Sequence, residues 1–436
     1  MSARWQDLGR APMVTVPRQV TTRPIVAAIA CAVMMLLPSL HAQTFSVIHS
    51  FSGAGDGATP MAGLTIDHAG NFYGTTMFGG SADGDCGAGG CGVAFRLHQQ
   101  SSGWVLTPVY SFLGGKDGSN PEYSPLVFGP DGSLYGSTSQ GGGPCSANGN
   151  GCGTVFNLKP PLTSCKSTLC TWSETILHSF KGSDGDGPVG ALTFDAAGNV
   201  YGATTSGAFR NGGAVYELLA SSGWMVKILY NAYGYSGSSP LFNPSGNLYG
   251  TTFVGGNGLG SVYQLTPTGG GWVSQDLYDF SSGSDGGFPW AGLIFDAQGN
   301  LYGATTSGGS GNGGTVFKLT PSGGGWSLST LYSFASPGNG RLVVGPAANL
   351  LLDQDGNLYG TTVADGAFGF GAVFKLTPGS GGWSYTSLHD FTGGSDGANP
   401  FSSLTLDSNG VLYGTASAGG TGTCAGGCGV VFKITQ

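Results

Sequence analysis

A tyrosine-containing segment, Gly-Asn-Leu-Tyr-Gly-Thr-Thr with its variants, recurs seven times along this chain of 436 residues. Its tyrosines are Tyr73, Tyr135, Tyr201, Tyr249, Tyr302, Tyr359 and Tyr413. The mean spacing between them is about 57 residues, within the range of four-stranded propeller blades. Self-similarity at this period is typical of proteins that place one supersecondary unit in each repeat, so it restricts the chain to repeat architectures.

Each repeat carries three further segments in a fixed order around the tyrosine segment. In the fifth repeat, Pro289–Asp296 precedes it, Thr315–Leu319 follows it, and Trp326–Phe334 comes last. All four segments are short, rich in β-branched or aromatic residues and bounded by Gly, Pro, Asn or Asp, which is typical of strands. We name them strands a, b, c and d. Apolar neighbours such as Val316 and Phe317 indicate that strand c is buried on both faces, as in sheets stacked face to face.

The order of segments at the two ends of the repeat region predicts a closed ring. Residues 44–51 form a d strand, whereas the last repeat ends with its c strand, Val430–Ile434. The N-terminal strand can therefore complete the last blade, which removes two exposed sheet edges. Six d strands carry a Trp eight residues before the position of their last aromatic residue, which is Ala232 in the third repeat, and the matching position before Phe51 is Gln43. The sequence predicts an all-β fold, a seven-bladed β-propeller with four antiparallel strands per blade.

The first 42 residues have the pattern of an export signal. Two arginines precede an apolar run, Pro24–Leu37, and a small residue, Ala42, occupies the expected cleavage position. We expect a signal peptide at 1–42 and a single propeller domain at 43–436. The protein would then be secreted, with the periplasm or the cell surface as alternative destinations. The apolar run is short for a bilayer span, and no second one follows, so no transmembrane anchor is expected.

Composition excludes two classes of protein. After removal of residues 1–42, 11 basic residues remain against 22 acidic ones, a net charge of −11. An acidic surface of this kind repels phosphate backbones, so nucleic acid is not an expected partner. The 84 glycines do not indicate disorder, because 17 Tyr, 24 Phe and 8 Trp provide side chains to bury.

Five of the loops from strand d to the next strand a contain Asp-Gly-x-x-Pro. Their aspartates are Asp56, Asp117, Asp184, Asp285 and Asp396. With strand a innermost, these carboxylates would surround the channel mouth, where they could bind a cation or a sugar. The alternative is a turn in which each Asp bonds its own loop, and repetition around the ring favours it. Calcium needs six to eight oxygen ligands, more than the one Asp of each loop supplies. We expect neither a metal nor another cofactor.

Eight cysteines remain in the exported chain, and they form four close pairs: Cys86 with Cys91, Cys145 with Cys152, Cys165 with Cys170, and Cys424 with Cys428. In an exported protein such pairs predict local disulfides. The alternative is a zinc site made from two pairs, but no histidine supports it.

Three of the pairs lie in unusually long b-to-c loops. From the strand-b tyrosine to the strand-c aromatic residue, repeats one, two and seven span 22, 21 and 19 positions, whereas the other four span 14 or 15. Ring closure makes these three blades neighbours. The sequence therefore predicts one face with three enlarged, disulfide-stapled loops, either for ligand binding or for protection against proteolysis.

The Tyr-Gly-Thr-Thr, Gly-Gly, Val-Phe-x-Leu and Asp-Gly-x-x-Pro elements together resemble the Gloeo–Verruco (GloVer) repeat family of exported bacterial proteins. The resemblance covers essentially all of residues 43–436. It implies an extracellular propeller, often tethered by a C-terminal sorting segment. Nothing follows the last strand of this chain, so no tether is expected. The family provides no catalytic residues to carry over.

The sequence contains no recognisable catalytic constellation, neither a nucleophile elbow nor a phosphate loop nor a metal-binding histidine pair. His49, His178 and His389 occupy the strand-d position that is tyrosine in other repeats, so we interpret them as packing variants.

We expect a monomeric, non-enzymatic binding protein or surface-associated scaffold whose partner is an extracellular glycan or protein. The candidate ligand-binding residues are Asp56, Asp83, Asp85 and Asp117. The alternative is a carbohydrate-active enzyme, a polysaccharide lyase or glycosidase, for which Asp83 and Asp85 are the best local carboxylates. Catalytic residues are otherwise unassigned.

Overall fold

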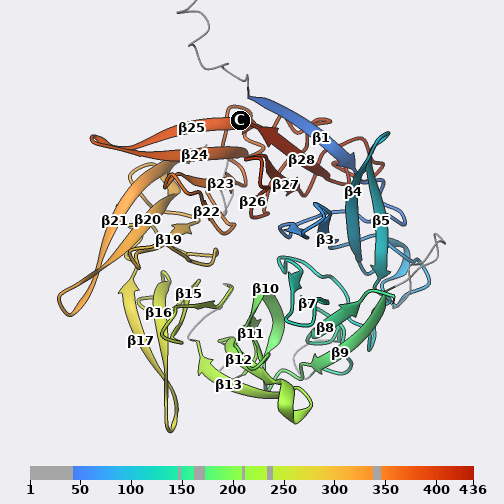
Figure 1. Ribbon diagram of the computed structural model, residues 1–436, viewed down its shortest axis with the longest axis horizontal. Coiled ribbons are helices and arrows are strands. Elements are labelled where there is room, and N and C mark those ends of the chain that lie inside the picture. The colour runs from blue at the N-terminus through green and yellow to red at the C-terminus, as the bar shows by residue number, and fades with distance from the viewer. Residues whose placement is uncertain (1–42, 146–148, 162–171, 209–211, 233–238, 337–344) are drawn as a thin grey trace, which may run out of the picture. The chain divides into compact units, whose positions relative to one another are not determined.

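The computed structural model describes residues 43–145, 149–161, 172–208, 212–232, 239–336 and 345–436. Within them, 28 strands form seven four-stranded sheets that are arranged in a ring (Figure 1). The predicted seven-bladed β-propeller is confirmed.

Two expectations fall on residues outside the described ranges. One is the signal peptide at residues 1–42. The other is the disulfide between Cys165 and Cys170. Both Cys165 and Cys170 lie within 162–171, so this fourth pairing stays a prediction, in contrast to the other three cysteine pairs.

Every blade has the strand order a-b-c-d, with strand a nearest the ring centre (Figure 1). Blade 1 comprises β2 (Thr65–Ile66), β3 (Phe72–Thr76), β4 (Val93–Gln100) and β5 (Gly103–Ser111). Blade 2 comprises β6 (Val127–Phe128), β7 (Leu134–Thr138), β8 (Thr154–Lys159) and β9 (Ser173–Ser179). Blade 3 comprises β10 (Asp186–Phe194), β11 (Val200–Ser206), β12 (Ala214–Leu219) and β13 (Met225–Asn231). Blade 4 comprises β14 (Leu241–Phe242), β15 (Leu248–Thr252), β16 (Ser261–Thr268) and β17 (Gly271–Asp279).

Blade 5 comprises β18 (Ile294–Phe295), β19 (Leu301–Thr305), β20 (Asn312–Ser322) and β21 (Gly325–Ala335). Blade 6 comprises β22 (Leu351–Leu352), β23 (Leu358–Thr362), β24 (Ala372–Gly379) and β25 (Gly382–Asp390). Blade 7 comprises β26 (Thr405–Leu406), β27 (Leu412–Ala416), β28 (Val430–Thr435) and β1 (Thr44–Ser50). The helical elements of the described chain are two 3₁₀ turns, η1 (Gly87–Gly89) and η3 (Ala220–Ser222). Neither has the length and apolar character needed to cross a membrane.

The ring closes through blade 7, as predicted. Strand β1 pairs antiparallel with β28, and Phe45 lies opposite Ile434 in this register while Val47 lies opposite Phe432. Figure 1 shows the two strands side by side although they come from opposite ends of the chain. The pairing covers the outer edge of β28, and β1 takes the edge position that strand d has in every blade.

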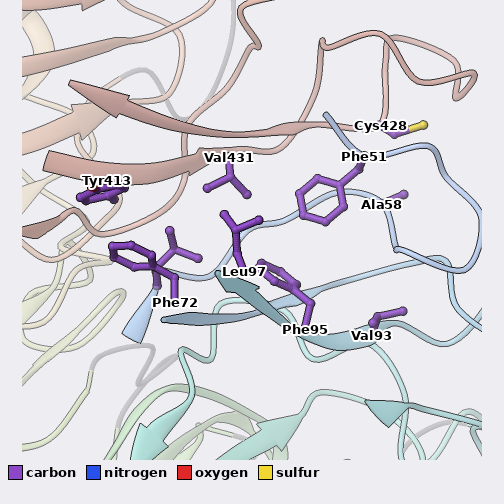
Figure 2. Close-up of a cluster of buried hydrophobic side chains, with 10 residues drawn as sticks. Phe51, Ala58, Phe72, Val93, Phe95, Leu97, Tyr413, Cys428 and Val431 are labelled. Atoms are coloured by element: carbon purple, nitrogen blue, oxygen red, sulfur yellow. The ribbon is translucent and has the colours of Figure 1, made fainter. Parts of the chain in front are cut away.

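The core lies between blades rather than within one blade. Val93, Phe95 and Leu97 of β4 are fully buried against Tyr413 and Val431 of blade 7, as Figure 2 shows. Ala94, which lies between them in sequence, packs against blade 2 instead. Because alternate side chains of a strand point to opposite faces, a blade with two neighbours buries consecutive residues of strand c.

The glycine of the Tyr-Gly-Thr-Thr segment is required by this packing. A Cβ atom added at Gly74 would lie 2.6 Å from the Phe95 ring and 2.9 Å from Leu64. The preceding tyrosine has two functions: the Tyr73 hydroxyl donates to Asp67 in the a-to-b turn at 3.1 Å, and its ring lies 5.8 Å from Trp172 of the next blade. The repeated motif is therefore explained by contacts between neighbouring blades.

Candidate functional site

The three long b-to-c loops of blades 7, 1 and 2 are closed by disulfides. The bonded pairs are Cys86–Cys91, Cys145–Cys152 and Cys424–Cys428, with Cα–Cα distances of 5.3, 5.3 and 5.1 Å. We call these three segments the stapled loops. Among the described residues, the one group of side chains close enough to hold a metal is Cys145, Cys152 and Asp186. Because the two sulfurs are joined, a single carboxylate remains there, and the zinc alternative gains no support.

Each disulfide lies at a joint between blades. The carbonyl of its second cysteine accepts a hydrogen bond from the residue before the proline that leads into the next blade: Thr59 N–H to Cys428 (2.8 Å), Asn120 N–H to Cys91 (2.9 Å) and Gly187 N–H to Cys152 (3.0 Å). In blades without a staple, Leu259 and Phe370 accept the same bond, from Phe288 and Asn399. The cysteines thus replace large apolar residues at a position that links neighbouring blades.

The stapled loops of blades 1 and 2 enclose a groove of about 750 Å³. The loop from blade 1 to blade 2 forms its third side. Its polar side chains are Asp85, Ser119, Asn120, Gln140 and Asn150, and the two disulfides border it. Phe78, with 39% of its surface exposed, adds one aromatic ring, and most of the remaining lining is glycine backbone.

Asn120 is the most informative residue of this groove. Its side chain makes no hydrogen bond to any described residue, and although only 8% of the whole residue is exposed, the amide atoms themselves reach the solvent of the groove. Asn399 occupies the same position in blade 7, with a similar positive φ (52° against 57°), and its Nδ2 donates to the Val363 carbonyl at 2.9 Å. The amide of Asn120 therefore has donor and acceptor groups available to a ligand.

The two aspartates beside the first staple differ in position. Asp85 lines the groove, and its carboxylate lies so close to Gly115 that a Cβ atom there would be 2.5 Å from Oδ2. Its backbone N–H donates to the Leu113 carbonyl at 2.7 Å, which fixes the loop. Asp83 is exposed and is not part of the lining.

The Asp-Gly loops are turns that bond themselves. Asp117 accepts hydrogen bonds from the Leu113 N–H (2.6 Å) and the Tyr110 hydroxyl (2.5 Å). Asp56 accepts one from the Ser52 N–H at 3.0 Å and lies 3.2 Å from His49 Nε2. Asp184, Asp285 and Asp396 follow the same pattern. The turn interpretation is confirmed, and each carboxylate points back to the outer strand d of its own repeat.

The strand-d histidines do more than pack. His49, His178 and His389 take the hydrogen-bonding position that Tyr110 and Tyr278 have in other repeats. Burial alone would raise the pKa of Asp396, but hydrogen bonds from Thr392 and His389 hold it below its usual value. The sequence showed this shared bonding partner only as a spacing of six or seven residues between the strand-d residue and the aspartate.

One titratable group was not predicted from the sequence. Glu174, in β9, lies with Oε2 3.0 Å from the Tyr110 hydroxyl, and its buried Oε1 has no partner among the described residues. Burial, together with the nearby Asp117, raises the pKa of Glu174 to about 9, so the carboxyl is protonated at neutral pH. The matching positions, two residues after the strand-d tryptophan, are Leu106, Val226, Ser274, Leu328 and Tyr385. The sequence could have revealed Glu174 only as an acidic residue at a repeat position that is mainly apolar in the other blades.

Comparison with known proteins supports the repeat assignment. The Gloeobacter/Verrucomicrobia repeat model matches residues 36–241 and 226–432. A search of curated protein sequences found no match. The chain is similar in structure to a protein described as a putative gluconolactonase, with a TM-score of 0.43 and 11% identity, over 92% of this chain and 94% of that one.

Two further solved structures are similar. A gluconolactonase from Xanthomonas campestris has a TM-score of 0.42 and 16% identity, over 86% of this chain and 96% of that one. A protein from Thermus thermophilus, described as a putative oxidoreductase (glucose dehydrogenase), has a TM-score of 0.41 and 18% identity, over 71% of this chain and 95% of that one. At these TM-scores the similarities bear on neither the activity nor the ligand of this chain. The two family matches, in contrast, span most of the sequence, and the protein therefore belongs to the Gloeobacter/Verrucomicrobia repeat family.

Proposed function

We propose that this protein is an exported, non-enzymatic glycan-binding propeller whose site is the groove between the stapled loops of blades 1 and 2. The observation that carries the proposal is the solvent-facing Asn120 amide, which lines the groove without a hydrogen-bonding partner in the described chain. A hydrogen bond to such an amide contributes about 0.5–1.5 kcal/mol net, which a ligand that pairs with it gains in affinity.

The composition of the groove suits a sugar. Carbohydrates combine an apolar C–H face with a rim of hydroxyl groups that both donate and accept. Phe78 offers a ring for the apolar face, and the amides of Asn120 and Gln140 with the Asp85 carboxylate offer both kinds of hydrogen-bonding group. The two disulfides hold the walls in place before binding, which lowers the entropy lost on association.

The groove favours binding over hydrolysis. Its described lining contains one carboxylate, Asp85, and no imidazole. A glycosidase of the usual kind needs two carboxylates about 5–10 Å apart across the substrate, and Asp83 is not part of the lining. Asp117, whose oxygens are already bonded, would act indirectly by holding the loop that carries Ser119 and Asn120. Asp56 would hold the matching loop between blades 7 and 1.

Export is part of the proposal. Disulfides persist in oxidising compartments outside the cytosol, and three lie in loops of this protein. They are consistent with the signal-like pattern of residues 1–42.

A pair of matched substitutions tests the proposal. The exported protein is first screened for binding and for product release on plant, algal and bacterial polysaccharides. Asn120→Gly keeps the positive φ and reproduces Gly187, the residue at this position in blade 3, so it should remove glycan binding and leave the melting temperature almost unchanged. Asn399→Gly, at the same position in blade 7, should lower the melting temperature and leave glycan binding unchanged, because the Asn399 amide is bonded within the protein.

Two outcomes would overturn the proposal. One is full glycan binding by Asn120→Gly. The other is product release by the wild-type protein, which would favour the polysaccharide lyase or glycosidase alternative.

A further inference from the structure

Five aromatic residues meet at the channel mouth on the face that carries the stapled loops. The Tyr123 ring lies 5.7 Å from Trp290 and 5.9 Å from Phe401. The Phe253 ring lies 5.2 Å from both Trp290 and Phe288. All five side chains are partly exposed. We call these residues, which come from blades 2, 4, 5 and 7, the aromatic cluster.

Local departures from the repeat create this cluster. Between the loop proline and the buried leucine, blade 2 has one residue more than blade 1: Pro121 to Leu126 against Pro60 to Leu64. The additional residue brings Tyr123 to a φ of +50°, which is uncommon for tyrosine. Trp290 likewise stands where blade 6 has Ala347. Propeller packing does not require either aromatic side chain, because other blades fold without them.

Little space lies between the rings of the cluster. The space enclosed with Trp290, Tyr123 and Phe401 is about 30 Å³, enough for about two water molecules. Its described lining contains no carboxylate and no imidazole. A ligand would therefore lie across the exposed ring surfaces instead of entering the channel.

The cluster is continuous with the groove through one loop. Asn120, which lines the groove, precedes Tyr123 by three residues, so their Cα atoms are at most about 10 Å apart. The Glu122 N–H donates to the Asn120 carbonyl at 2.8 Å, which fixes this connection. The Tyr123 hydroxyl has no partner among the described residues, and burial, with the nearby Glu122, raises its pKa to about 12. It remains protonated and able to donate.

We infer that the aromatic cluster is a second subsite, which binds one pyranose ring of a neutral oligosaccharide whose other units occupy the groove. This inference rests on the proposed function of the groove. Neutral sugars are favoured because Asp85 and Glu122 place carboxylates in the groove and beside the cluster, and because the exported chain is strongly acidic. Rings of Trp, Tyr and Phe provide large apolar contact with little loss of conformational entropy.

Calorimetric titration of the exported protein tests the inference by ligand length. The probes are the disaccharide and hexasaccharide of the cello-, xylo-, manno- and chito- series, with hexagalacturonate as the anionic comparison. In the series that binds, Trp290→Ala and Tyr123→Gly should each weaken hexasaccharide binding about tenfold and leave disaccharide affinity unchanged. The fold should accept both substitutions. Alanine already stands at the position of Trp290 in blade 6, as Ala347, and glycine readily adopts the positive φ of Tyr123. The control is Phe368→Ala, which removes a ring that is 59% exposed in the b-to-c loop of blade 6.

Each other result contradicts the inference in a distinct way. Wild-type hexasaccharide affinity in both cluster variants, combined with loss of binding in Asn120→Gly, would overturn the second subsite and leave the groove intact. Equal weakening by Phe368→Ala would show a non-specific effect. Hexagalacturonate binding as tightly as a neutral hexasaccharide would contradict the argument from charge. Absence of binding to any of the oligosaccharides would overturn both the groove and the cluster.

Discussion

The stapled joints of blades 7, 1 and 2 and the plain joints of blades 4 and 6 make the same hydrogen bond with different residues. In a plain joint, Leu259 or Phe370 accepts the N–H of the next blade at 2.7 Å. In a stapled joint a cysteine accepts it, and the loop around that cysteine is longer by four to eight positions. Blade packing is satisfied by the shorter loop. The additional residues are therefore surplus to the fold, and in blades 1 and 2 they form the walls of the groove.

The largest expected effect concerns the closure of blade 7, the stapled blade that is completed by the N-terminal strand. Deletion of residues 43–52 removes β1 and leaves β28 with an open edge. The variant should aggregate and lose its cooperative melting transition. Size-exclusion chromatography and thermal unfolding measure this. A monomeric variant with the wild-type melting temperature would show that closure is unimportant.

The joint between blades 1 and 2 also contains Glu174, beside Tyr110. The equivalent residue at the joint between blades 5 and 6 is Tyr385, whose ring stacks on that of Tyr332 with the centroids 4.7 Å apart. The pKa of Glu174 is about 9 in the folded protein and about 4.5 when unfolded, so its favourable contribution to folding is complete below pH 4.5 and is lost as the pH rises towards 9. Glu174→Gln should thus raise the free energy of unfolding by up to roughly 5 kcal/mol at pH 8 and by about 1 kcal/mol at pH 5.

Denaturant unfolding of both proteins at the two pH values checks this prediction. The groups that face Glu174 are the Tyr110 hydroxyl and Asp117, and both are retained in the variant. A difference between variant and wild type that is independent of pH would mean that Glu174 ionises normally.

Removing a staple should have a smaller effect. Each disulfide closes a loop of a few residues, worth about 2 kcal/mol in the chain-entropy model, so Cys86→Ala with Cys91→Ala should lower the free energy of unfolding by that amount. Leu259→Ala at a plain joint should cost a similar ~2 kcal/mol through lost packing. Denaturant titrations compare the two. A staple variant with unchanged stability but faster loop proteolysis would mean that the disulfide acts only on the loop.

The smallest effect is expected in the core. Blades 1 and 2 have Phe95 and Phe156 in strand c, whereas blade 3 has Tyr216, whose buried hydroxyl has no hydrogen-bonding partner among the described residues. Tyr216→Phe should raise the free energy of unfolding by about 1 kcal/mol, because an unpaired polar group leaves the core. Differential scanning calorimetry would detect it. A destabilised variant would reveal that the hydroxyl has a partner.

Much of the fold was predictable because its determinants repeat. The tyrosine, glycine and tryptophan positions report contacts between neighbouring blades, and seven copies make each position visible. The three described staples were predictable from the spacing of their cysteines. The groove was predictable only as a region, because Asn120 and Asn399 occupy the same Asn-Pro sequence and differ in what surrounds their amides. The aromatic cluster could not be predicted, because it brings together residues of blades that are not neighbours, and no fixed spacing in the sequence indicates such contacts.

The central claim is that the surplus length of the stapled loops serves binding. The most direct measurement is glycan affinity after each of the three loops is shortened to the 14 or 15 positions found in the other repeats, with the strands unchanged. We predict that the variants shortened in blade 1 or blade 2 stay folded and lose binding, because each removes one wall of the groove. If all three shortened variants stay folded and bind as the wild type does, the loops are protective and the claim is wrong.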